Sequence, residues 1–120
     1  MKIKKNQSLD RVEPLCKYYQ KCGGCQLQHV DYQAQLRFKK QIVEETFDKY
    51  YNGKLNEKLL KNTIGMQNPY HYRNKVKLPV RYDGESLVTG LYASDTNRLV
   101  YIDECLIEKE DLRKAVDEIC

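Results

Sequence analysis

The sequence predicts an α+β fold, in which an antiparallel β-meander is flanked by helices and preceded by a cysteine-rich loop. Residues 31–51 repeat apolar side chains with the period of a helix, and the segment after Pro69 alternates with the period of a strand. Ahead of both, Cys16, Cys22 and Cys25 fall within ten residues of one another. These three observations together lead to the predicted fold class.

Length and composition indicate one soluble domain, or part of one. The chain has 120 residues, a charged fraction of 32% and a mean hydropathy of -0.77. No apolar run approaches the roughly 20 residues of a membrane span, and the charged N-terminus lacks the apolar core of a secretory signal. We therefore expect a cytoplasmic protein with no membrane partner, in which thiols stay reduced.

We expect the chain to divide into four segments. Residues 1–15 form a polar N-terminal extension, and residues 16–30 form the cysteine-rich loop. Residues 31–66 form a helical segment, and residues 67–120 form an antiparallel sheet with a C-terminal helix.

The first predicted helix runs from a cap at Asp31 to about Tyr51, where residues 52–53 (Asn-Gly) act as a stop signal. A second, shorter helix is predicted over residues 56–63. One face of the first helix carries an apolar stripe: Tyr32, Leu36, Val43, Phe47 and Tyr50. This stripe is expected to meet a partner surface, which in an isolated chain leads to a possible homodimer.

The sheet is predicted from alternation and turn residues. One face of the first strand is apolar, formed by Val76, Leu78, Val80 and Tyr82. The turn at residues 83–84 (Asp-Gly) leads into a second strand over 87–92, and a third is expected over 99–103. A last helix over 109–119 is expected to bury Leu112, Val116 and Ile119.

The cysteines predict a metal or cluster site. Cys16, Cys22 and Cys25 have the spacing C-x5-C-x2-C, and the glycines between the last two accept positive φ angles that let the loop turn tightly. A four-cysteine site needs one more ligand. Cys105 directly follows the third strand and is positioned rigidly, whereas Cys120 lies in a terminal helical turn that can fray. We assign the four ligands as Cys16, Cys22, Cys25 and Cys105.

The spacing favours an iron–sulfur cluster over zinc. Structural zinc sites usually combine two short cysteine pairs, whereas a trio with a distant fourth cysteine is more typical of 4Fe–4S ligation. Zinc remains the alternative, and so do unliganded cysteines or disulfides formed in air. His29 lies just beyond the trio and is expected to pack nearby rather than to bind a metal.

A basic strand face is the best candidate for nucleic-acid contact. Cations and aromatic rings that could meet phosphates and bases gather there: Arg73, Lys75, Lys77, Arg81, Tyr72 and His71. The alternative is an ordinary solvated edge strand. The net charge is +4, and residues 1–40 hold nine Lys or Arg against three Asp or Glu, so Lys17, Lys21, Lys39 and Lys40 would extend the surface.

Several blocks of the chain, in this order, resemble the RNA uracil-C5 methyltransferases. The blocks are Arg11-Val-Glu-Pro-Leu-Cys16, Cys22-Gly-Gly-Cys25-Gln-Leu-Gln-His29, Tyr72-Arg73-Asn74-Lys75-Val76, Gly90-Leu91-Tyr92 and Asp103-Glu-Cys105-Leu-Ile107. The resemblance covers nearly everything from Arg11 onward. It implies a 4Fe–4S cluster on the four assigned cysteines, and a central domain that helps to bind ribosomal or transfer RNA.

The resemblance also implies parts that this sequence does not contain. Such enzymes typically carry an N-terminal oligonucleotide-binding barrel (the TRAM domain) and a catalytic domain that binds S-adenosylmethionine. The chain has no G-x-G-x-x-G loop and no nucleophile motif, so we expect no catalytic residue here. The expectation is an iron–sulfur, RNA-binding fragment of such an enzyme, whose missing catalytic domain would be a partner. The alternative is a stand-alone zinc-binding RNA-binding module.

Overall fold

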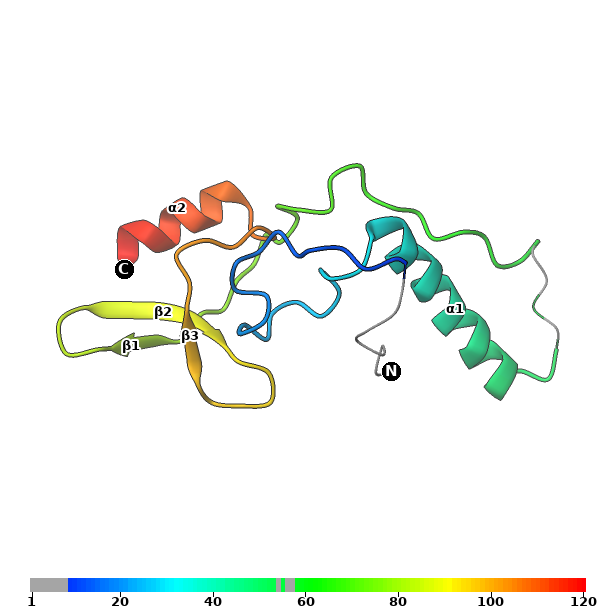
Figure 1. Ribbon diagram of the computed structural model, residues 1–120, viewed down its shortest axis with the longest axis horizontal. Helices are drawn as coiled ribbons and strands as arrows, with labels where there is room; N and C mark the ends of the chain where they lie inside the picture. The colour runs from blue at the N-terminus through cyan, green and yellow to red at the C-terminus, as the bar shows by residue number, and fades with distance from the viewer. Residues whose placement is uncertain (1–8, 54, 56–57) are drawn as a thin grey trace. The chain divides into compact units, whose positions relative to one another are not determined.

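The computed structural model describes residues 9–53, 55 and 58–120, and confirms the α+β fold class (Figure 1). The chain forms two compact units. The first comprises Met1–Glu13 and His29–Gln67, and the second comprises Pro14–Gln28 and Asn68–Cys120. The cysteine loop therefore belongs to the same unit as the sheet. In the described residues, no helix has the length and apolar character that crossing a bilayer requires.

The first unit is built on helix α1, Tyr32–Tyr50, which begins where the sequence predicted. The Asp31 carboxylate caps it by accepting hydrogen bonds from the backbone N–H groups of Gln33 and Ala34, at 3.0 and 3.3 Å. The chain after the helix returns along its first turns. There the Tyr32 hydroxyl accepts a hydrogen bond from the Met66 N–H at 2.8 Å. These contacts fix the N-terminal half of α1.

The second half of α1 exposes its apolar side chains. Phe47 is 44% exposed and Tyr50 is 75% exposed, so the predicted stripe is covered only near the start of the helix. The predicted helix over 56–63 is not formed: residues 58–63 are turn and irregular structure, and residues 56 and 57 lie outside the described residues. The apolar side chain of Leu59 is 69% exposed, so it offers no packed face to stabilise a short helix.

The second unit contains a three-stranded antiparallel sheet with strand order β1-β2-β3. The strands are β1 (Val80–Tyr82), β2 (Leu87–Tyr92) and β3 (Leu99–Tyr101). Figure 1 shows them as a meander joined by two turns. The second predicted strand is confirmed over its whole length, and the third ends two residues earlier than predicted.

The first strand is much shorter than predicted. The backbone of Arg73 is already engaged elsewhere, because its N–H donates to Ile107 O at 2.8 Å and its carbonyl accepts from Lys109 N–H at 3.0 Å. Pro79 has no N–H to offer to a ladder, so pairing with β2 starts only at Val80. On the predicted apolar face, Val80 and Tyr82 are 53% and 68% exposed.

The core of the second unit lies on one face of β2 and β3. Ala93, Val100 and Ile102 are buried there, and the partly buried side chains of Leu91, Tyr18, Cys22 and Cys105 pack against them. Helix α2, Glu110–Ile119, forms as predicted. However, no residue of α2 is fully buried, and Ile119 is 75% exposed rather than buried.

Candidate metal centre

The cysteine loop is held in shape by its own hydrogen bonds. The N–H of Cys22 donates to Tyr18 O at 2.8 Å, and the N–H of Gly24 donates to Cys22 Sγ at 3.3 Å. The side-chain oxygen of Gln28 accepts from the Cys16 N–H at 3.3 Å. The loop therefore closes on itself, with the first and last parts joined through Gln28.

Gly23 joins this loop to the end of β2. Its N–H donates to Tyr92 O at 2.9 Å. A Cβ at this position would lie 2.8 Å from Tyr92 O and 2.9 Å from Ser94 N, both of them backbone atoms. Among the described glycines, positive φ occurs at Gly84 and not in this loop. The sequence suggested that this glycine serves a left-handed turn. The structure shows instead that Gly23 is required for close approach of the loop to the sheet.

Asp103, which follows β3, ties the loop to the sheet a second time. Its carboxylate accepts a hydrogen bond from the Tyr18 hydroxyl at 2.7 Å and lies 2.9 Å from Lys17 Nζ. The hydrogen bond from Lys17 lowers the pKa of Asp103, and the same contact raises the pKa of Lys17. Both side chains are more than half exposed, so the pair positions the loop more than it stabilises the fold.

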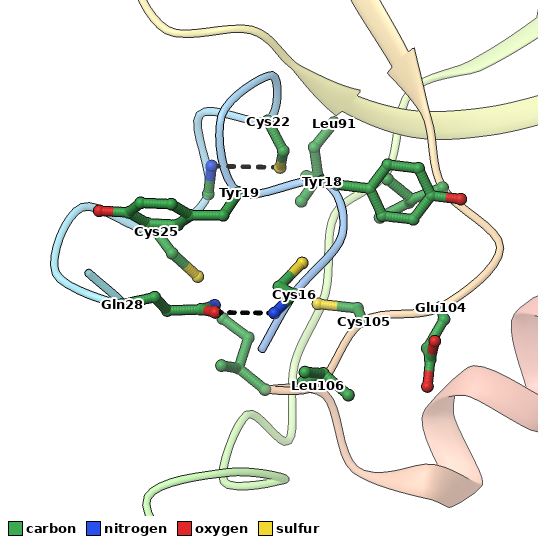
Figure 2. Close-up of a pocket in the computed structure, with 13 residues that line it drawn as sticks. Cys16, Tyr18, Tyr19, Cys22, Cys25, Gln28, Leu91, Glu104, Cys105 and Leu106 are labelled. Atoms are coloured by element: carbon green, nitrogen blue, oxygen red, sulfur yellow. Dashed lines mark hydrogen bonds between the residues drawn. The ribbon is translucent and has the colours of Figure 1, made fainter. Parts of the chain in front are cut away.

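These contacts bring the four predicted ligands to one pocket (Figure 2). The pocket encloses about 380 Å³ of space, part of which is open to solvent. Figure 2 shows Cys16, Cys22 and Cys25 entering it from the loop, and Cys105 from the segment after β3. All four are half-buried free thiols, and the rest of the lining is largely apolar and aromatic: Tyr18, Tyr19, Gly24, Gln28, Leu91, Ile102, Glu104, Leu106 and Ile107. Cys120 is exposed and does not line it.

Two of the four pocket thiols, Cys22 and Cys105, are harder to ionise than an exposed cysteine. Burial raises the pKa of Cys22, and negative charge on Cys25 or Cys16 would raise it further. Burial also raises the pKa of Cys105, to which Glu108 and Cys25 add. Bound positive charge would favour the thiolate forms of Cys22 and Cys105 against this effect of burial.

The cysteines do not surround a single point. Within residues 9–53, 55 and 58–120, no three His, Cys, Asp or Glu side chains form a group that could hold one metal ion. The shared feature of the four thiols is the common pocket and not a tetrahedral shell. His29 belongs to the other unit and is not among the residues that line the pocket.

The predicted nucleic-acid residues are only partly brought together. Lys75 and Lys77 are exposed along the chain that leads into β1, and Arg81 is exposed within β1. Arg73 is half-buried and lies near enough to Cys22 to lower the pKa of that thiol slightly, against the larger effect of burial. His71 is exposed, and its Nδ1 lies 2.9 Å from Glu108 O.

Tyr72, which lies between His71 and Arg73 in the chain, is 49% exposed. The lysines Lys17 and Lys21 are exposed on the cysteine loop, whereas Lys39 and Lys40 belong to the other unit. Sequence reasoning missed the roles of Tyr18, Gln28 and Asp103. Each of them lies within three residues of a proposed cysteine ligand, which was the sole signal in the sequence that could have drawn attention to them.

Comparison with curated proteins finds relatives that share the name RNA methyltransferase. No family model matches the chain. It is 45% identical over 116 residues to a protein of Bacillus cereus, 40% identical over 115 residues to one of Enterococcus faecalis, and 46% identical over 111 residues to one of Listeria monocytogenes. Each of these relatives is named an uncharacterized RNA methyltransferase. The matches cover 92–96% of this chain but 24–25% of each relative, so the chain spans about a quarter of their length.

Proposed function

From the premise that this chain is homologous to about a quarter of these RNA methyltransferases, we propose that it is the cluster-holding, RNA-binding part of an RNA uracil-C5 methyltransferase. The observation that carries the proposal is the single pocket lined by Cys16, Cys22, Cys25 and Cys105 within the homologous segment. Methyl transfer from S-adenosylmethionine to uracil C5 would belong to the longer protein. We assign no catalytic residue to this chain.

A 4Fe–4S cluster suits this set of donors better than zinc. The four thiols line one pocket, three from the loop and the fourth from the segment after β3, and a trio with a distant fourth cysteine is more typical of 4Fe–4S ligation. In a four-iron cluster each thiolate binds a different iron, so the ligands stand further apart than around one ion. Bound iron would supply positive charge that offsets the raised pKa of Cys22 and of Cys105. In this role the cluster is structural, because methylation of uracil C5 moves no net electrons.

Removing the cluster is expected to loosen the contact between the cysteine loop and the end of β2. Iron-free chain, kept reduced, should exchange the amide protons of Gly23 and Gly24 at least about tenfold faster than iron-loaded chain. The amide of Ala34 in the other unit serves as the internal control and should exchange at the same rate in both samples. Equal protection of Gly23 with and without iron would contradict the structural role.

The exposed basic segment is proposed to contact RNA phosphates. Lys75 and Lys77 point to one side of an extended chain whose Val76 and Leu78 are half-buried, and Arg81 follows on β1. Cations held on a fixed backbone match the regular spacing of phosphates and release counterions on binding. The stand-alone zinc module would use the same segment, so the metal content separates these two alternatives.

Neutralising the two lysines is expected to weaken RNA binding and to reduce its salt dependence. For the double variant Lys75→Gln and Lys77→Gln, the slope of log Kobs against log salt should fall by roughly 1.4, about 0.7 for each lost phosphate contact. The matched control is Lys109→Gln with Lys114→Gln, which removes the same charge from the exposed, acidic start and body of α2. Equal losses in both double variants would mean that net charge, and not this segment, governs binding.

A further inference from the structure

The two faces of the sheet are occupied differently. Side chains alternate along a strand, so Leu91 and Val100, which pair with each other, point to the face covered by the cysteine loop. Their neighbours Tyr92 and Tyr101 point to the opposite face. The register pairs Tyr101 with Gly90 and Tyr92 with Leu99, so the two tyrosines are diagonal neighbours on that face.

Both tyrosine rings are accessible. Tyr92 is 40% exposed and Tyr101 is 56% exposed. On this face Tyr101 lies opposite Gly90, which has no side chain, and Tyr92 lies opposite the half-buried Leu99. A Cβ at Gly90 would collide with the backbone carbonyl of Val100, so the packing of β2 on β3 keeps this position bare. The two exposed rings therefore lie on one face of β2 and β3, beside a glycine position that has no side chain.

The cationic side chain of Arg81 lies beside these rings. The Arg81 guanidinium carbon lies 5.9 Å from the centre of the Tyr92 ring, within the range of a cation–π contact. Arg81 continues the basic segment that includes Lys75 and Lys77. Asp103, the acidic residue that follows β3, forms an ion pair with Lys17. The face formed by Tyr92, Tyr101 and Arg81, here called the tyrosine face, therefore combines aromatic rings with positive charge.

We propose that the tyrosine face binds single-stranded RNA by stacking bases on Tyr92 and Tyr101, with Arg81 beside the adjoining phosphate. This inference rests on the proposed function and extends it to a site for nucleobases. Splayed bases stack on aromatic rings exposed on a sheet, and arginine adds both charge and a planar surface. The positive charge favours a polyanion over a protein partner, because Arg81 continues the exposed basic segment of Lys75 and Lys77 onto this face.

The test is the binding of a fluorescein-labelled ten-nucleotide uridine strand to the anaerobically purified 120-residue chain, followed by fluorescence anisotropy at several salt concentrations. Tyr101→Ala should weaken binding by about fivefold to about a hundredfold, without changing the salt slope. Tyr101→Phe keeps the ring and should bind as the unaltered chain does. Tyr82→Ala removes a more exposed tyrosine from the other face of the same three-stranded sheet. This variant should bind the uridine strand as the unaltered chain does.

A strand of the same length that lacks bases completes the test. It should bind the unaltered chain and the Tyr101→Ala variant equally, because no base remains to stack. Equal weakening of both strands would mean that Tyr101→Ala distorts the sheet, and would overturn the proposal. Unchanged uridine binding by Tyr101→Ala would also overturn it, while persistent salt-dependent binding would leave the proposed function intact. A chain that binds neither strand would overturn both.

Discussion

Replacing Cys105 by serine is expected to abolish the cluster. Anaerobically purified chain should contain about four irons, and the Cys105→Ser variant less than about one. Cys105 is the one proposed ligand outside the loop, so its loss removes the covalent link from the loop to the segment after β3. Because metal binding contributes directly to folding free energy, the variant should also melt at a lower temperature. Iron content and thermal unfolding on the same preparation measure both effects.

The matched control is Cys120→Ser. Cys120 is exposed, follows α2 and does not line the pocket, so this variant should keep its iron and its melting temperature. The reverse pattern, with iron lost from Cys120→Ser and kept in Cys105→Ser, would refute the proposed ligand set. Equal iron contents in both variants would refute Cys105 as a ligand.

Replacing Gly23 by alanine is expected to push the cysteine loop away from the sheet. The new Cβ would meet Tyr92 O at 2.8 Å and Ser94 N at 2.9 Å, and backbone atoms of a strand end cannot rotate away. Overpacking of this kind costs about 1–3 kcal/mol. The hydrogen bond from Gly23 N–H to Tyr92 O would be strained as well. The melting temperature should fall by about 5 °C or more, and iron should be lost faster.

Gly24→Ala provides the comparison at the adjacent position. There a Cβ would meet the side-chain atoms Leu91 Cδ1 at 3.2 Å and Cys22 Sγ at 3.4 Å. Leu91 can adjust its rotamer, so the expected cost stays below about 1 kcal/mol. If Gly24→Ala proved the more damaging substitution, close approach to β2 would not be the reason for a glycine at Gly23.

The parts of the fold that depend on neighbouring residues could be predicted from the sequence. Asp31 caps α1 through its own side chain, and β2 follows directly from the alternation after the turn at Gly84. The first strand could not be predicted correctly, because its length depends on a distant segment. Arg73 pairs with residues 107–109, and no local pattern indicates that its backbone is already engaged.

The site shows the same division between local and distant causes. Spacing selected Cys16, Cys22 and Cys25, and the position directly after the third predicted strand selected Cys105. All four line one pocket. Spacing could not indicate that Asp103 receives Tyr18 and Lys17, since that contact depends on how the loop lies against β3. It also could not separate exposed tyrosines from packed ones, because burial is set by the tertiary arrangement.

The most direct test of the central claim is the visible absorption spectrum of anaerobically purified chain, with iron, sulfide and zinc measured on the same sample. A four-cysteine cluster predicts a broad shoulder near ~400 nm, about four irons and about four sulfides per chain, and no stoichiometric zinc. A colourless protein with one zinc per chain would contradict the cluster and favour the stand-alone zinc module. A colourless protein with neither metal would contradict both forms of the metal site.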